Sequence, residues 1–296
     1  MVTVKRTAVG SDIGWEIYNP SLRIFIPEGF GPRIMELSLE SGPNLLAVLP
    51  EARIPVPGQI PFSLRGGHRL WAAPERPKVT YAEDDRPLEI TQQEKGLDIH
   101  QETDRAGLQK SWQVRLESES PEVTIRHQLV NESGEPIELA PWAVTMLQPG
   151  GVGLLPLFAG EKGLHGTAPD RQLIVWPYTD LESPYLQITN EGVFIRAQVA
   201  EGMLKIGAPN PAGWLAYSQN ETLFVKRSVY LEGKEYPDRG ASHQIYCDPG
   251  TIELETVGPL VKLAPGDSTD HQETWNVYKD GNWPSAIRDL FDLRGR

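Results

Sequence analysis

The sequence predicts an all-β protein, a large antiparallel sandwich or barrel with little helix. Three observations support this fold class. Apolar and polar residues alternate in many segments, which is the period of a half-buried strand. Turn signals recur at short intervals, and the 26 prolines and 28 glycines are spread along the chain instead of gathering in a linker. At 296 residues, the chain is long enough to bury a substantial core.

The strand-like segments follow one another from the N-terminus. In residues 15–27, Leu22, Ile24 and Ile26 share one face, and residues 111–119 show the same pattern. Trp112, Val114 and Leu116 are its apolar positions. Strand-like runs flank a turn in each of four later segments, residues 122–139, 185–199, 213–233 and 250–278. The turns are, in the same order, NESGEP, NEG, SQNET and APGD.

Only the tail, PSAIRDLFDLRGR in residues 284–296, has the pattern of a helix. Its apolar residues Ile287, Leu290 and Leu293 stand at helical spacing. No internal repeat, low-complexity tract or shift in composition divides the chain. We therefore predict a single domain over residues 1–296.

Composition excludes several classes of partner. The formal net charge is −12 and the pI is near 5.0, so we expect neither a nucleic acid nor an anionic membrane as partner. Cys247 is the single cysteine, which excludes an intrachain disulfide and a cysteine-based zinc site. The first residues lack the apolar segment of a secretory signal, and no run of roughly 18 apolar residues exists. We expect a cytoplasmic protein of open oligomeric state.

The stretch LRGGHRLWAAPE, residues 64–75, combines a glycine pair with basic residues, a tryptophan and a carboxylate. Glycines and cations are typical of phosphate loops, whereas a tryptophan beside charged residues is typical of sugar sites. No helix follows the stretch, so it is not a phosphate loop at a helix N-terminus. We predict a turn and strand edge at the mouth of a sugar-sized cleft.

Three blocks resemble the galactose mutarotase-like superfamily, which contains the aldose 1-epimerases. LRGGHRLWAAPE looks like the arginine-glycine-glycine segment of hexose-phosphate epimerases, and resembles a GGHRLW-containing branch of the superfamily. VNESGEPIELAPWAVTML is similar to the strand-turn-strand that leads to the mutarotase histidine, and ELETVGPLVKLAPGDSTDHQETW to the strand that carries the catalytic glutamate. The resemblance spans residues 15–278. It implies a β-supersandwich with a concave sugar-binding sheet and epimerase chemistry without a cofactor.

In that chemistry a glutamate takes the proton of the anomeric hydroxyl while a histidine protonates the ring oxygen. Glu255 matches the glutamate, and Arg65 or Arg69 matches the arginine that binds the sugar's hydroxyl or phosphate oxygens. Where mutarotases place the histidine, this chain has APWAVTML, with Trp142 as the nearest large side chain. His68 is the nearest replacement acid, because imidazole titrates in the right range.

Further residues complete the predicted site, each beside a structural alternative. Trp71 and Trp142 either stack on a pyranose or belong to the core. Glu75 either holds a neighbouring arginine or accepts hydrogen bonds from sugar hydroxyls. Glu253 shares a strand face with Glu255 and either raises the pKa of that carboxyl group by repulsion or lies at the rim.

Two lysines stand at strand positions flanked by apolar residues. Lys205 and Lys226 either project into the cleft, where they add charge for an acidic sugar or a phosphate, or lie on exposed edge strands. The enzyme hypothesis requires that four side chains converge on one concave pocket. These four are Arg69, His68, Glu255 and Lys226.

We therefore predict an aldose 1-epimerase-like enzyme for a sugar or sugar derivative, with Glu255 as base and His68 as acid. Two alternatives stay open. One is a carbohydrate-binding protein without catalysis, and the other is a different reaction, such as a lyase or hydrolase step, on the same fold. No histidine pair has the spacing of a metal site, so neither a transition metal nor a cofactor is predicted.

Overall fold

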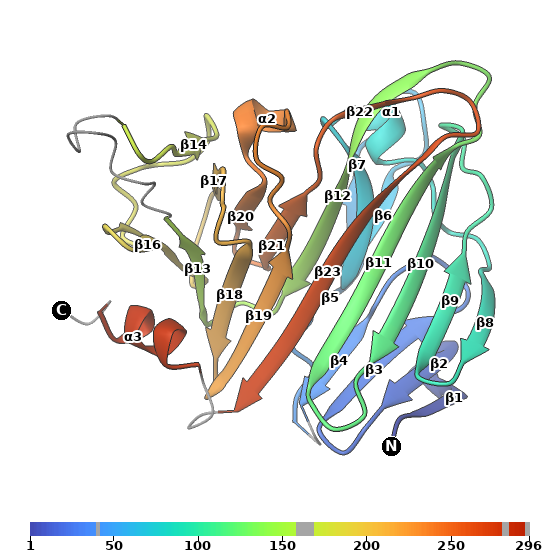
Figure 1. Cartoon of the computed structure of the whole chain (residues 1–296), viewed down its shortest axis with the longest axis horizontal. Helices are drawn as coiled ribbons and strands as arrows, with labels where there is room; N and C mark the ends of the chain where they lie inside the picture. The colour runs from blue at the N-terminus through green and yellow to red at the C-terminus, as the bar shows by residue number, and fades with distance from the viewer. Residues whose placement is uncertain (40–41, 158–168, 280–283, 294–296) are drawn as a thin grey trace.

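The computed structural model describes residues 1–39, 42–157, 169–279 and 284–293, and it consists mainly of β-strands (Figure 1). The pairings between its strands are antiparallel. The predicted all-β fold class is confirmed. Two large sheets form the body of the molecule, and two small sheets close one end of it.

The largest sheet has ten strands, and the long strand β23 lies near its middle. In sheet order the strands are β15 (Leu186–Ile188), β16 (Gly192–Arg196), β13 (Val152–Pro156), β18 (Trp214–Gln219), β19 (Thr222–Ser228), β23 (Ser268–Lys279), β11 (Glu122–Asn131), β10 (Leu108–Leu116), β9 (Gly96–His100) and β8 (Glu89–Gln93).

The second sheet has seven strands and carries the candidate site. Its order is β14 (Ile174–Val175), β17 (Leu204–Ala208), β20 (His243–Cys247), β21 (Ile252–Val257), β12 (Ile137–Leu147) and β22 (Val261–Leu263). The remaining strand, β7 (His68–Ala73), pairs with the middle of β12. β12 is thus the strand on which the N-terminal and C-terminal parts of this sheet meet.

The smaller elements surround these two sheets. A four-stranded sheet runs in the order β1 (Thr3–Val9), β2 (Asp12–Tyr18), β3 (Leu22–Pro27) and β4 (Glu36–Leu39), and β5 (Val48–Ile54) pairs with β6 (Phe62–Gly66). The helices are α1 (Pro77–Thr80), α2 (Pro237–Gly240) and α3 (Ser285–Leu293). None of the helices in the described part of the chain is long and apolar enough to cross a membrane.

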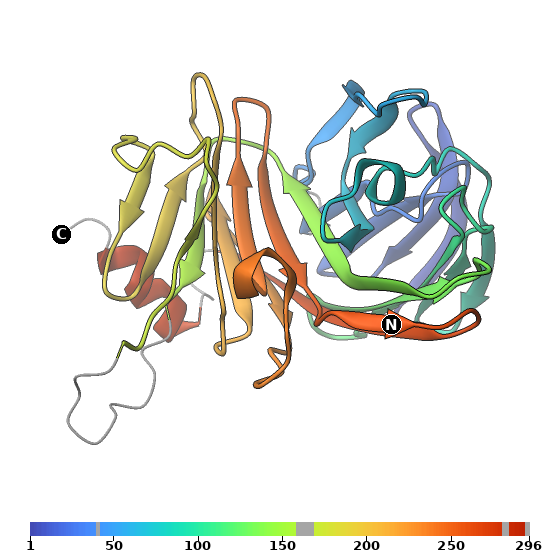
Figure 2. The same cartoon turned by 90° about the horizontal axis from the view of Figure 1, so that it is seen from above.

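The core lies between the sheets, where their apolar faces meet. Ile252 and Leu254 of β21 pack with Phe224 and Trp275 of the ten-stranded sheet, and all four are fully buried. The predicted helix α3 covers the opposite side of the ten-stranded sheet, with Ile287 buried there (Figure 2). Because Ile252 and Leu254 face the core, the alternate residues of β21 face the other side of the seven-stranded sheet.

The alternation in the sequence locates most of these strands correctly. Leu22, Ile24 and Ile26 are buried on β3, as predicted, although Phe25 on the other face is buried as well. The apolar face predicted for residues 111–119 is buried in β10. NESGEP connects β11 to β12, NEG connects β15 to β16, SQNET connects β18 to β19, and APGD connects β22 to β23.

The glycine pair of LRGGHRLWAAPE forms a crowded backbone corner between β6 and β7. Arg65, Gly66 and Gly67 all have positive φ angles, of 56°, 84° and 71°. A Cβ atom on Gly66 would lie 2.1 Å from the carbonyl oxygen of Ala47, and one on Gly67 would lie 2.3 Å from that of Ile34. The glycines therefore allow close approach of protein backbone here, whereas the sequence suggested close approach of a ligand.

Candidate functional site

A cleft of about 450 Å³ opens on the face of the seven-stranded sheet that points away from the core. Its floor follows from strand register. Met146 of β12 lies opposite Glu253 of β21, Glu253 lies opposite Tyr246 of β20, and Tyr246 lies opposite Lys205 of β17. Residues opposite one another in antiparallel strands project to the same face. The other lining residues include Leu49, Ile54, Leu64, Trp71, Glu75, Tyr81, Trp142, Tyr178, Asp248 and Thr251.

Aromatic side chains form one wall of this cleft. Trp71 of β7 lies opposite Trp142 of β12, and their ring centroids are 5.2 Å apart in an edge-to-face arrangement. The ring of Tyr81 packs edge-on against Trp71, also at 5.2 Å, and its hydroxyl donates to Glu75 (2.6 Å). Both tryptophans are only 5% exposed, yet both line the cleft. They belong to a hydrophobic cluster and to the site at once.

Glu255 lies beneath the cleft surface instead of lining it. Its side chain is fully buried, and its Oε2 accepts hydrogen bonds from Trp142 Nε1 and Lys205 Nζ, each at 2.8 Å. The Lys205 ammonium also lies over the rings of Trp142 and Trp176, 4.9 and 4.8 Å from their centroids. Glu255 Oε1 is buried and has no partner among the described residues. The carboxylate thus holds two residues of the cleft wall in place.

Glu253, two residues away, is the carboxyl group that lines the cleft floor. Its side chain is 8% exposed, and no hydrogen bond joins its carboxyl group to the described residues. Burial and then the charge of Glu255 raise its pKa to about 8, against smaller opposing effects of Lys205 and Arg69. Glu253 is therefore largely protonated at neutral pH.

The two predicted arginines occupy different surroundings. Arg69 points to the same face as Glu255 and is 1% exposed; its Nη2 donates to the Gly66 carbonyl (2.8 Å) and the Met146 sulfur (3.0 Å). Its guanidinium group stacks on Trp71, 4.9 Å from the ring centroid. Arg65 instead forms an ion pair with Asp85 at 2.9 Å. Neither arginine is among the residues that line the cleft, because Arg69 is buried behind Trp71 and Met146 and Arg65 is paired elsewhere.

His68 and Lys226 lie on the core side of the seven-stranded sheet, so the predicted convergence of four side chains is not observed, and the mechanism with Glu255 as base and His68 as acid, which required it, is not supported. Lys226 is fully buried; its ammonium donates to the Ala143 and Leu254 carbonyls (2.9 and 3.0 Å) and pairs with Glu273 (3.0 Å). The reason is that side chains along a β-strand alternate between its two faces. His68 and Arg69 are adjacent on β7, so their side chains must point to opposite faces.

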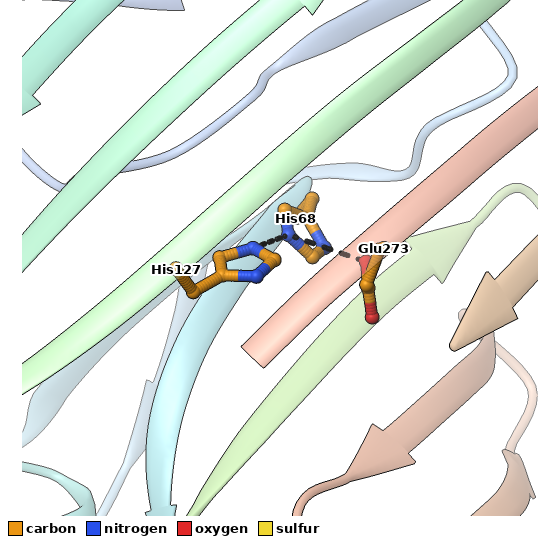
Figure 3. A group of neighbouring side chains, drawn as sticks. All are labelled: His68, His127 and Glu273. Carbon is orange, nitrogen blue, oxygen red and sulfur yellow. Dashed lines mark hydrogen bonds and ion pairs between the residues drawn. The ribbon is translucent and has the colours of Figure 1, made fainter. Parts of the chain in front are cut away.

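A chain of hydrogen bonds connects His127, His68 and Lys226 in the core, and Figure 3 shows its link between the two histidines beside Glu273. His127 Nδ1 donates to the His271 carbonyl at 3.0 Å, so its Nε2 carries no proton and accepts from His68 Nε2 at 2.8 Å. His68 Nδ1 then accepts from the Thr145 hydroxyl (3.0 Å), which in turn accepts from Lys226 (2.9 Å). Burial lowers the pKa of His127 to about 3 and that of His68 as well, which keeps both rings neutral.

His68, His127 and Glu273 bring three ligand atoms within 4.8 Å of one another, which is the geometry of a possible metal site. The donors are already engaged, however. Both oxygens of Glu273 have partners, Lys226 at 3.0 Å and Trp275 Nε1 at 2.9 Å, and the two imidazoles bond to each other. A cation beside Lys226 would also meet its positive charge. The group fits a hydrogen-bonded core network better than a metal centre.

Several lining residues were not predicted from the sequence, namely Tyr81, Tyr178, Tyr246 and Asp248. For Tyr246, the sequence contains a turn signal from which its position could have been predicted. Asp248, Pro249 and Gly250 form a turn between two strand-like runs, and pairing outward from this turn places Tyr246 opposite Glu253. Tyr81 and Tyr178 lie outside the strands, and the local pattern contains nothing that would place them.

Comparison with known proteins supports the fold through structure alone. No protein-family model matches the chain, and no curated protein matches it in sequence. A protein from Salmonella typhimurium proposed to be a mutarotase superposes with a TM-score of 0.57 at 10% identity, over 93% of this chain and 94% of that one. A proposed aldose 1-epimerase from Escherichia coli K12 gives a TM-score of 0.51 at 11% identity, over 94% and 100%. The chain has the galactose mutarotase-like fold.

The galactose mutarotase-like fold also occurs within a longer neighbour. A TPR-domain containing protein from Parabacteroides distasonis matches with a TM-score of 0.58 at 12% identity, over 92% of this chain and 48% of that one. The chain thus spans about half the length of that protein. These structures confirm the fold that the resemblance of the three sequence blocks implied. At such identities the shared property is the galactose mutarotase-like fold, and function depends on the cleft itself.

Proposed function

We propose that this chain binds a carbohydrate in the cleft of the seven-stranded sheet. The observation that carries the proposal is the composition of one sheet face. Aromatic rings, a carboxyl group that has no hydrogen-bond partner among the described residues, tyrosine hydroxyls and an ammonium group all line a space of about 450 Å³. Sugars present apolar C–H faces and polar hydroxyl edges, and such a mixed lining complements both. The volume lies in the usual range for small-molecule sites.

The charges around the cleft favour hydroxyl groups over phosphate. Lys205 lines the cleft, but its charge is offset by Glu255 at 2.8 Å, and Glu75 and Asp248 add acidic groups. Lys226, which the sequence suggested as a cation for an acidic ligand, is sealed in the core and paired with Glu273. Our proposal therefore places the aromatic wall at the sugar ring and the polar floor at its hydroxyls.

Binding is tested by isothermal titration calorimetry and ligand-observed NMR with a panel of neutral, phosphorylated, acidic and amino sugars. We expect at least one neutral sugar to bind and Trp71→Leu to weaken its binding by about two- to tenfold, since stacking on an aromatic ring is worth roughly 0.5–1.5 kcal/mol. Trp15→Leu, on β2 of the N-terminal sheet, is the matched control and should leave affinity unchanged. If no sugar binds, or if both variants bind like the wild type, the proposal is wrong.

Aldose 1-epimerase activity is a second candidate function, favoured by one specific observation. Glu253 lines the cleft and its pKa of about 8 lies close to working pH, the condition for efficient proton transfer. The fold of the proposed epimerase from Escherichia coli supports the same reaction class by analogy only. Exchange NMR on any sugar that binds measures whether anomer interconversion is accelerated.

A further inference from the structure

Anomer interconversion requires two proton movements, and the cleft offers few groups for them. One proton leaves the anomeric hydroxyl and another reaches the ring oxygen. Glu255 cannot touch a ligand in this arrangement, because it is fully buried under Trp142 and Lys205. His68 lies on the other face of the sheet and is engaged by Thr145 and His127. The glutamate and the histidine expected for the family's mechanism are therefore both out of reach.

Glu253 differs from these groups in geometry. It projects from β21 into the cleft between Met146 and Tyr246, its opposite neighbours on the adjacent strands. No described residue hydrogen-bonds to its carboxyl group, and neither of its oxygens is sealed off in the way that Oε1 of Glu255 is. Glu253 is 8% exposed and lines the cleft, so its carboxyl group, which the described residues leave without a hydrogen-bond partner, can meet a ligand there; this is an unusual state for a carboxyl group in a mostly buried side chain.

We propose that Glu253, as an undissociated carboxylic acid, carries both proton transfers of the reaction by itself. The inference rests on the proposed function, namely sugar binding in this cleft with epimerase activity. The Glu253 O–H donates its proton to the ring oxygen while its other oxygen accepts the proton of the anomeric hydroxyl. The bond between C1 and the ring oxygen breaks and the C1 carbonyl forms. The carboxyl group ends protonated on the opposite oxygen, so no second acid or base is needed.

The return step uses the same group in reverse. After the aldehyde rotates, the carboxylic acid protonates the carbonyl oxygen and accepts the proton of the attacking hydroxyl, which gives the other anomer. A single carboxyl group with two free oxygens suits this bifunctional transfer, since donor and acceptor are held at a fixed spacing. A cleft in which one carboxyl group performs both transfers needs no histidine, and this cleft has Trp142 at the position where mutarotases have theirs.

Glu255 acts in this scheme as a positioning residue. Its hydrogen bonds fix Trp142 and Lys205 in place. The burial of Glu253 and, second to it, the charge of Glu255 raise the pKa of Glu253 and keep its carboxyl group protonated at neutral pH. The other charged and titratable groups that act on Glu253 from the surrounding elements are Lys205 of β17, Arg69 of β7, Asp248 after β20, Tyr246 of β20, Tyr81, Tyr178 and Lys226. Lys205 and Arg69 oppose the rise in pKa, and Asp248 adds to it.

The test follows the exchange rate of a bound sugar from pH 6.5 to pH 10, above the range in which protonation of the buried histidines destabilises the fold. Within this range we expect activity to stay level below about pH 8 and to fall above it, where Glu253 ionises, without a second limb on the acid side. Glu253→Gln should lose at least about 100-fold in rate while sugar affinity changes less than about threefold. Glu253→Asp, which keeps the carboxyl group, should retain part of the activity. Glu138→Gln, an exposed position of β12 outside the cleft, is the matched control.

Glu255→Gln separates positioning from proton transfer. Removing its charge also frees Lys205, and both effects lower the pKa of Glu253, so the falling limb should move to lower pH by one unit or more. A ¹³C NMR titration of the Glu253 carboxyl group, with its midpoint near 8 in the wild type, checks the same shift without any substrate.

Each remaining outcome identifies what has failed. A bell-shaped pH profile, or full activity in Glu253→Gln, overturns the assignment of both transfers to Glu253 while epimerase activity stands. Sugar binding without acceleration also overturns it, and leaves only the binding function. If no sugar binds, the proposed function and this inference fail together.

Discussion

Lys226 shows at the scale of one residue how strongly this fold depends on buried charge. Its side chain has no exposed surface, and its ammonium group spans the two sheets, from Glu273 on β23 to carbonyls of β12 and β21. Burial lowers its pKa, and the Glu273 carboxylate opposes that change. A buried ion pair is costly to break from one side, because the remaining charge is left without compensation.

Lys226→Met should therefore lower the free energy of unfolding by about 3–5 kcal/mol, measured by urea denaturation. The double variant with Glu273→Gln should recover part of this loss, because the stranded carboxylate is removed as well. Lys262→Met, at an exposed position of β22, is the control and should change the free energy by less than about 0.5 kcal/mol. A loss equal in both lysine variants would show that Lys226 has no special role.

At the same scale, the sequence located the residues of the site better than it located their contacts. Trp71, Glu75, Trp142 and Lys205 line the cleft, and their roles with a ligand stay predictions. Glu255 was expected to act directly, whereas the structure buries it behind two of these residues. The difference arises because alternation defines which face a side chain takes, but not which neighbour from another strand covers it.

Among the elements, the corner between β6 and β7 determines the position of the aromatic wall. Gly67 donates to the Ala47 carbonyl (2.8 Å) and accepts from the Met146 amide (3.0 Å), which ties β7 to β12. From this corner onward, β7 presents Arg69 and Trp71 to the cleft face and His68 to the core. The glycine pair of the sequence motif thus acts on the site through strand placement.

Gly67→Ala tests this role against a glycine of similar backbone conformation. Gly67 and Gly58 have φ angles of +71° and +73°, but a Cβ atom at Gly67 meets the Ile34 carbonyl oxygen at 2.3 Å, whereas at Gly58 it meets nothing within 4 Å. Gly58→Ala should cost about 1–2 kcal/mol from the φ angle alone, and Gly67→Ala should cost several kcal/mol more because the strand pairing must shift. Equal thermal destabilisation of the two variants would contradict this account.

Strand pairs joined by short turns were predictable, whereas pairs distant in sequence were not. Residues 252–257 and 243–247 form a hairpin around a recognisable turn, but the pairing of β7 with β12 joins residues about 75 positions apart. Nothing in either segment alone specifies that partner, because both simply have buried residues on two faces. Such pairings depend on the packing of the whole chain.

For the whole molecule, four buried histidines set the response to acid. Burial lowers the pKa of His127 and His243 to about 3, of His271 to about 4, and of His68 as well. In the unfolded chain a histidine takes up a proton below about pH 6.5, whereas these four stay neutral in the folded state. The unfolded state therefore binds more protons as the pH falls, and stability is lost from about pH 6.5 downward.

We expect each of these histidines to lower the free energy of unfolding by about 2 kcal/mol at pH 5. That pH lies about 1.5 units below the pKa of a histidine in the unfolded chain, and each unit corresponds to about 1.36 kcal/mol. Together they approach the whole stability of a typical domain, so unfolding near pH 5 should be steep and cooperative. Thermal melts followed by circular dichroism from pH 8 to pH 4.5 measure this. His127→Gln should reduce the slope by about one proton. A stability that is flat down to pH 5 would refute the prediction.

Alternating hydrophobicity and turn residues determined from the sequence alone that this chain folds as antiparallel β-sheet, and the resemblance of three motifs indicated which β fold it adopts. These signals are local, because side-chain direction and turn geometry depend on a few consecutive residues. Only the tertiary structure decided that Glu253 opens into the cleft while Glu255 lies sealed beneath it. It likewise decided that His68 and Lys226 belong to the core. Those distinctions depend on which distant strands pair and what they cover, which is a property of packing that no single segment contains.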